Sequence, residues 1–309
     1  MLPSLPSVPA MTALLLLACC LLLGLATARL ARPPAGLAAS LNWWVIQIAL
    51  PALVLELIPR LHMDPDLWFL VASQWMVFAA ALVVFHTLGS RLGWSRARIG
   101  ALVLMTGLGN TSFVGYPLLE ALRGREGLAL GVVADQLGCF VMLSLGGVLV
   151  SVIYAGGTAK PAEITRKVLL FPAFLALLAG LVVGQLGGWP EPVNEVLHRL
   201  GQTLSPLAVF SVGLRLRFRL QPSHRLPVVV ALGWKLAIIP ALTLLWGKLI
   251  GLDGLLLSIA VLQTAMAPMI SAAILADQYR LEPELAQAIL GLGIILSLLT
   301  VPWWSSVLP

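Results

Sequence analysis

Long apolar runs, separated by short polar or Pro/Gly-rich stretches, follow one another along the whole chain. A helix needs about 20 mostly apolar residues to cross roughly 30 Å of hydrocarbon. Ten such runs lie near residues 10–28, 41–59, 67–89, 97–122, 127–155, 167–188, 194–213, 226–250, 254–279 and 284–306. They lack the two-residue alternation of membrane barrel strands. The pattern therefore predicts an all-α polytopic membrane protein with ten transmembrane helices.

Composition agrees with a chain that lives in a bilayer. Hydrophobic residues make up 60% of the 309 residues, charged residues 10%, and the mean hydropathy is +0.99. These values lie outside the range of soluble domains. The net charge of +6 comes from basic residues at run ends and not from a basic stripe interleaved with aromatics, so no nucleic-acid partner is expected.

Basic residues gather in alternate loops, which predicts the orientation of the chain. The richer loops lie at 29–32, 91–98, 160–167, 215–225 and 280. Short cytoplasmic loops hold the excess of Lys and Arg. We therefore expect both termini on the outer, periplasmic side of a bacterial inner (plasma) membrane. No basic residue precedes the first run, so a cleaved signal peptide is not expected.

Two halves of the chain, 1–158 and 159–309, show traces of an internal repeat. ALPALV around Pro51 resembles LSPLAV around Pro206, and two apolar runs are interrupted at corresponding places, by GLGNTSFVGYP (107–117) and TAMAPMIS (264–271). Five spans in each half give the halves opposite orientations. Inverted repeats with broken helices are typical of secondary transporters that bind substrate at mid-membrane.

The interruptions carry the candidate binding chemistry. Proline inside a helix removes a backbone donor, so Pro117 and Pro268 are expected to free backbone groups that hydrocarbon cannot satisfy. Helices that restart there would bring positive N-terminal ends toward a ligand, which implies an anion. The alternative is a kink that serves packing alone. The candidate substrate-binding residues are Asn110, Thr111, Ser112, Gly115, Pro117, Gln136, Gln263, Ala267 and Pro268.

Asp135 and Lys235 are the ionisable residues deepest in the predicted spans. Their matching depth permits a buried ion pair, which could exchange partners with a proton, a cation or the substrate, or could only fasten two helices together. Glu56, His86 and Asp277 lie near span ends, where we expect solvent to surround them. The three cysteines, among them Cys139, have no metal-ligand spacing and are interpreted as packing residues.

The sequence resembles the auxin efflux carrier family, which is distantly related to bile acid:sodium symporters. The resemblance covers nearly the whole chain. It rests on ASLNWWVIQIALPALV (39–54), GLGNTSFVGYPLLEAL (107–122), VADQLGCF (133–140), LGQTLSPLAVFSVGLRL (200–216) and APMISAAILADQYRLEPELA (267–286). Together these segments are specific for the family. The long cytoplasmic loop of plant members is absent, because the stretch 156–166 is short.

The resemblance implies a scaffold and dimerisation part from helices 1, 2, 6 and 7, and a mobile part from helices 3–5 and 8–10. It implies elevator-like alternating access for organic anions, with the site where helices 4 and 9 cross. The positions that match the family's site are Asn110, Thr111, Pro117, Gln136 and Pro268, with Asp135 and Lys235 flanking it. Bacterial relatives suggest small carboxylates such as malate or malonate.

We therefore expect a secondary transporter of small organic anions, a homodimer in contact with membrane lipid, with a proton or sodium as the candidate coupling ion. No cofactor, metal or catalytic residue is expected, because hydrolytic and nucleotide-binding motifs are missing from the sequence. Two other functions stay open: a membrane enzyme acting on a lipid-linked substrate, and a non-transporting sensor with the same fold.

Overall fold

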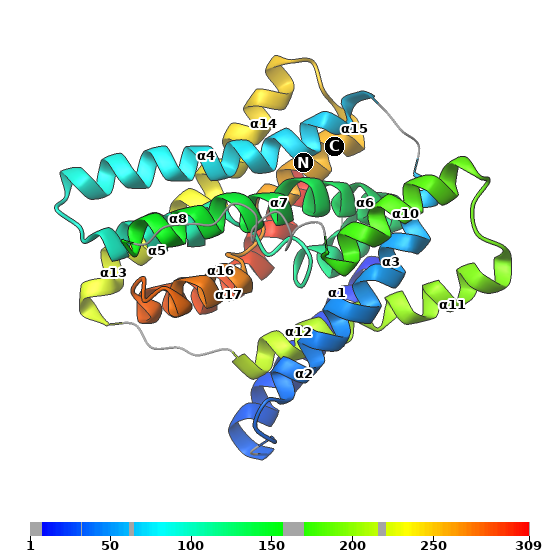
Figure 1. Ribbon diagram of the computed structural model, residues 1–309, viewed down its shortest axis with the longest axis horizontal. Coiled ribbons are helices and arrows are strands. Elements are labelled where there is room, and N and C mark those ends of the chain that lie inside the picture. The colour runs from blue at the N-terminus through cyan, green and yellow to red at the C-terminus, as the bar shows by residue number, and fades with distance from the viewer. Residues whose placement is uncertain (1–7, 32, 62–64, 157–169, 216–220, 309) are drawn as a thin grey trace. The chain divides into compact units, whose positions relative to one another are not determined.

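The computed structural model describes residues 8–31, 33–61, 65–156, 170–215 and 221–308, and its regular structure there is helical (Figure 1). Five helical stretches are long and apolar enough to cross a membrane. They are Leu37–Arg60, Pro65–Arg91, Gly115–Tyr154, Pro222–Leu249 and Pro283–Val307. The prediction of an all-helical polytopic membrane protein is confirmed. The count of ten helices and the inverted repeat stay predictions, as does the orientation, since much of the basic loops at 160–167 and 215–225 lies outside the described residues.

The chain folds into two compact units, each drawn from both halves of the sequence. Unit 1 comprises Met1–Pro65, Ser112–Val132 and Val168–Leu216, and unit 2 comprises Asp66–Thr111, Val133–Lys167 and Arg217–Pro309. The predicted halves 1–158 and 159–309 were defined by an internal repeat in the sequence, whereas the two units are defined by packing. The two halves therefore remain a prediction.

Unit 1 is built around two helix contacts. Its helices are α1 (Val8–Ala26), α2 (Leu37–Trp44), α3 (Leu50–Leu57), most of α6 (Gly115–Val133), α10 (Pro172–Gln185), α11 (Glu191–Gln202) and α12 (Leu204–Arg215). Helix α1 packs along α12, and both α10 and α11 pack on α3. The π-helical turn η2 (Val45–Ala49) joins α2 to α3, and the 3-10 turn η3 (Ile58–Arg60) ends this continuous helical stretch.

Glycine allows α1 and α12 to approach each other at backbone distance. A Cβ on Gly213 would lie 2.3 Å from the Leu21 carbonyl oxygen, and one on Gly24 would lie 2.2 Å from the Phe210 carbonyl oxygen. Small residues at such crossings allow membrane helices to pack by close backbone contact. The α1–α12 contact therefore depends on the absence of side chains at these two positions.

Unit 2 surrounds helix α5 (Arg96–Gly107), whose residues from Ile99 to Gly107 are all buried. The other long helices of the unit are α4 (Trp68–Arg91), α8 (Val148–Tyr154), α13 (Arg225–Gly233), α14 (Ile239–Leu249), α15 (Gly254–Thr264), α16 (Ile270–Gln278) and α17 (Pro283–Val307). Helices α4, α8, α13, α16 and α17 all pack against α5. The end of α5 is therefore held from many sides.

Side-chain caps fix the starts of α5 and α15, the two helices that later break. The Ser95 hydroxyl accepts a bond from the Arg98 backbone N–H at 3.1 Å. The Asp253 carboxylate accepts from the Gly254 N–H at 3.0 Å and from Lys248 at 2.8 Å. The Lys248 hydrogen bond holds the pKa of the Asp253 carboxyl below its usual range. Each cap satisfies a donor that a helix start leaves unpaired.

Proline explains two of the wide turns inside long helices. Turn η2 is followed at once by a helix with Pro51 near its start, and the π-helical turn η8 (Trp234–Ile238) is followed by one with Pro240. A proline ring clashes with the carbonyl one turn earlier and leaves it without its N–H partner. Local π-helical adjustment re-satisfies these groups inside a membrane helix.

We predict that Gly213→Leu destabilises the protein by about 1–3 kcal/mol, because the added side chain overpacks the α1–α12 contact. The apparent melting temperature in detergent measures this loss. Gly233→Leu is the matched control, since this exposed glycine of α13 has open space around its Cβ position. Equal losses in the two variants would contradict the close contact.

Candidate functional site

Both predicted helix breaks are present. Helix α5 ends at Gly107 and α6 begins at Gly115, while α15 ends at Thr264 and α16 begins at Ile270. The backbone between the helices includes turns at 111–114 and is extended at Leu108 (φ −118°, ψ 123°) and Met269 (φ −76°, ψ 136°). The two predicted interruptions at 107–117 and 264–271 are confirmed.

The two breaks meet inside unit 2 as a short antiparallel pair. Gly109 lies opposite Pro268. The Asn110 N–H donates to the Ala267 carbonyl at 2.7 Å, and the Met269 N–H donates to the Leu108 carbonyl at 3.1 Å. We call this pair the crossing, residues 108–111 and 265–269. It satisfies backbone groups that neither helix can satisfy once it has ended.

The two prolines lie at different places, and the predicted role of Pro117 stays a prediction. Pro268 lies in the crossing itself, where a Cβ on Gly293 of α17 would come within 2.5 Å of its Cδ. Pro117 is the third residue of α6 and does not lie in the break. The backbone N–H groups on both sides of Pro117, of Tyr116 and Leu118, donate to the carbonyls of Ser112 and Val114 at 3.2 Å.

A buried carboxylate lies beside the crossing. Thr111 Oγ1 donates a short hydrogen bond to Asp135 Oδ1, and Gln136 Nε2 donates to Asp135 Oδ2 at 2.7 Å. Asp135 is 3% exposed and Gln136 is fully buried. Within the described part of the chain, the other amide atom, Gln136 Oε1, has no hydrogen-bond partner.

Lys235 approaches the same backbone. Its Nζ donates to the Thr264 carbonyl at 3.2 Å, and a Cβ added to Gly109 would lie 3.2 Å from that nitrogen. The Cys139 thiol donates to the Gly109 carbonyl at 3.3 Å. Gly109 therefore leaves room for the ammonium group beside the crossing. A direct Asp135–Lys235 ion pair stays a prediction.

Both ionisable residues lie on widened helical turns. Asp135 belongs to the π-helical turn η5 (Ala134–Cys139), and Lys235 belongs to η8. Such turns disturb the regular backbone ladder and occur often at functional sites. A buried charge in a membrane segment costs at least a few kcal/mol and is usually retained for a function.

Unit 2 thus gathers most of the predicted site residues. Those that are buried in this unit are Asn110, Thr111, Asp135, Gln136, Lys235, Gln263, Ala267 and Pro268. Ser112, Gly115 and Pro117 belong to unit 1, and their part in the site stays a prediction. Cys139 was interpreted as packing alone, and its position in VADQLGCF, four residues after Asp135, was the signal for its place near the crossing.

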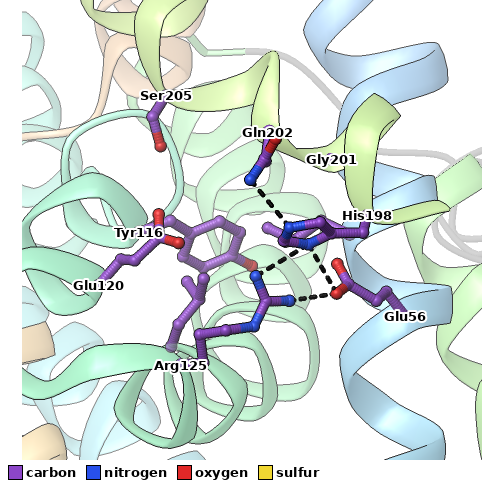
Figure 2. A pocket seen from close by; sticks show the side chains of 10 residues that line it. Glu56, Tyr116, Glu120, Arg125, His198, Gly201, Gln202 and Ser205 are labelled. Carbon is purple, nitrogen blue, oxygen red and sulfur yellow. Dashed lines mark hydrogen bonds and ion pairs between the residues drawn. The ribbon is translucent and has the colours of Figure 1, made fainter. Parts of the chain in front are cut away.

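A second polar cluster, in unit 1, was missed in the sequence. Glu56 was expected to be solvated, but it is only 3% exposed, forms an ion pair with Arg125 and lies within hydrogen-bond distance of His198 (Figure 2). The expectation for His86 and Asp277 is confirmed, since both are exposed. Glu56 differs from them because side chains from α6 and α11 cover it.

Comparison with known proteins agrees with this architecture. A family model described as membrane transport protein matches residues 9–305. An uncharacterized transporter of Methanothermobacter thermautotrophicus is 28% identical over 88% of this chain and 89% of its own length. A protein of Rhizobium meliloti named "putative malonate transporter" is 28% identical over 90% of this chain and 89% of its own length.

The match to the family model spans almost the entire chain and includes both breaks, η5 and η8. The quoted motifs and the polytopic helical structure agree with it. The chain therefore belongs to the membrane transport protein family, the auxin efflux carrier family that its sequence resembles.

Proposed function

We propose that this protein is a secondary transporter of small organic anions, with carboxylates as the substrate class, and that it binds them at the crossing. One observation carries the proposal: two broken segments pair through extended backbone in a buried polar site of unit 2. Hydrocarbon tolerates non-helical backbone only where protein or a cavity satisfies it, as in transporter binding sites.

The groups around the crossing suit an anion. Helix α16 begins directly after it, at Ile270, and a helix N-terminus carries partial positive charge and unpaired N–H groups. Lys235 supplies a full positive charge beside Gly109. The Asn110 amide and the Thr111 hydroxyl belong to the crossing and would orient a carboxylate. The Rhizobium relative, named for malonate, supports this substrate class.

Asp135 is the proposed coupling residue. Its carboxylate is buried and bonded to Thr111 and Gln136, both beside the crossing. A proton or sodium ion bound at Asp135 would change the charge that the substrate meets. The positive charge of Lys235 would balance the negative charge of Asp135 when no substrate is bound.

We further propose elevator-like alternating access in a homodimer in the plasma membrane, with both termini on the outer side. The division into two compact units supports this movement in part, because unit 1 contains the predicted segments one, two and seven and the described part of segment six. Residues 112–132, from predicted segments four and five, also belong to unit 1. The inverted repeat would supply the two alternating states. Helices 3–5 and 8–10 would carry the substrate.

We predict that malonate raises the apparent melting temperature of the purified protein and that Asn110→Ala reduces the shift to about half or less. A ligand at 100 times its Kd stabilises the state that binds it by about 2.7 kcal/mol. Loss of a hydrogen bond to a charged group costs about 1.5–3 kcal/mol, or roughly 10- to 100-fold in affinity. A panel of mono- and dicarboxylates, with and without sodium, measures the effect.

Asn194→Ala is the matched control for this experiment, because Asn194 is a buried asparagine of α11 in unit 1. It should keep the malonate shift. If Asn110→Ala keeps the shift as well, or if no carboxylate produces one, the crossing is a structural kink and not the anion site.

We predict that Asp135→Asn lowers labelled malonate flux into proteoliposomes at least tenfold while the protein still inserts and folds. The amide keeps the shape of the side chain but removes its charge and its proton site. Asp277→Asn serves as control, since Asp277 is an exposed carboxylate of α16. Wild-type flux in the Asp135 variant would show that this carboxylate only fastens helices together.

A further inference from the structure

The second polar cluster lies in unit 1 (Figure 2). Glu56 comes from α3, Arg125 from α6 and His198 from α11. They border a cavity of about 10 Å³, room for about one water molecule. An organic anion does not fit this space, so the smallest ligands, water and the proton, are the ones to consider.

Glu56 depends on Arg125 for charge balance. The carboxylate is 3% exposed, and Arg125 Nη2 donates a short hydrogen bond to its Oε1. Its other oxygen, Oε2, is buried and has no hydrogen-bond partner among the residues the structure describes. A buried carboxylate that loses its only cation is strongly destabilising. The ion pair therefore holds against α3 the part of α6 that follows the kink at Gly124 (φ 67°, ψ −166°).

His198 meets both members of this ion pair through one nitrogen. Its Nδ1 lies 2.9 Å from Glu56 Oε1 and 3.0 Å from Arg125 Nη1. Arginine can only donate, and an ionised carboxylate can only accept. One ring nitrogen cannot accept from Arg125 and donate to Glu56 at the same time, so the two contacts compete.

The other ring nitrogen can take up a proton without losing its partner. His198 Nε2 lies 2.8 Å from Gln202 Nε2, which donates to a neutral ring. Rotation of the Gln202 amide would instead present its oxygen to a protonated Nε2–H. The doubly protonated ring then donates Nδ1–H to Glu56 and faces Arg125 as a like charge.

We propose that Glu56, Arg125 and His198 form a proton-binding site, in which a proton on His198 releases Arg125 from Glu56. The protonated imidazole replaces the guanidinium as the cation beside the buried carboxylate. Arg125, whose side chain is 39% exposed, then turns to Glu120 or to solvent. The contact between α6 and α3 weakens when His198 takes up a proton.

The surrounding charges fit this exchange. The titratable and charged groups that line the cavity with His198 are Glu56 from α3 and Tyr116, Glu120 and Arg125 from α6, while α12 adds only Ser205. On α11 itself, Arg199 is paired with Glu195 on the exposed face. Glu120 is thus the other acceptor at hand for a released Arg125.

Helix α6 follows the crossing directly in the chain, so its release would bear on transport. That consequence rests on the proposed function, but proton binding does not.

We expect Arg125→Gln to lower the melting temperature strongly near pH 8 and less than half as much near pH 5.5, because histidine becomes charged between these values. With His198→Gln present as well, the loss should be equal at both pH values.

His86→Gln is the control, because His86 is a histidine of unit 2 that bonds Tyr154. When His86→Gln is combined with Arg125→Gln, the decrease in melting temperature should still depend on pH. If Arg125→Gln lowers the melting temperature equally at both pH values while His198 is present, the proposal is overturned. The proposal is also overturned if the decrease in melting temperature caused by Arg125→Gln still depends on pH when His198→Gln is present.

Hydrogen exchange of residues 115–133 gives a second test that does not need an Arg125 variant to fold. Wild type and His198→Gln are compared at the same pH, so that intrinsic exchange rates cancel. Near pH 5.5 we expect several-fold faster exchange in the wild type, and near pH 8 equal rates. Equal rates at both values would contradict a proton-controlled release of α6.

Discussion

The structure of unit 2 depends on the backbone pairing at the crossing. Two helices end in the interior of a protein that spans a bilayer, where water cannot satisfy the freed N–H and C=O groups. The bonds from Asn110 to Ala267 and from Met269 to Leu108 satisfy them reciprocally. Extended backbone at Gly109 and Pro268 permits this pairing, and the packing around α5 holds it in place.

The buried charges follow from the same constraint. Once extended backbone is held in the interior, the carbonyls of Gly109 and Thr264 become acceptors for Cys139 and Lys235. Asp135 and Lys235 both lie on widened helical turns and are buried in the same unit. The site therefore combines fixed backbone dipoles with one carboxylate and one ammonium group, a combination that suits binding an anion together with a coupling ion.

The sequence could predict the helices, the two breaks and the deep ionisable residues, because each of these features can be recognised within a short stretch of sequence. Gly107, Asn110 and Pro268 interrupt apolar runs, and Asp135 and Lys235 stand out within them. The sequence alone did not show that α6 begins at Gly115, before Pro117, because it does not say where the next helix starts after a break. Glu56 was missed because its partners lie 69 and 142 residues away, on α6 and α11. Burial by such distant partners leaves no local pattern.

An experimental density map of the protein with bound malonate would test the central claim most directly. The account predicts anion density at the crossing, within hydrogen-bond distance of Asn110 or of the first N–H groups of α16. Density at another place in either unit, with the crossing occupied only by its own side chains, would contradict it.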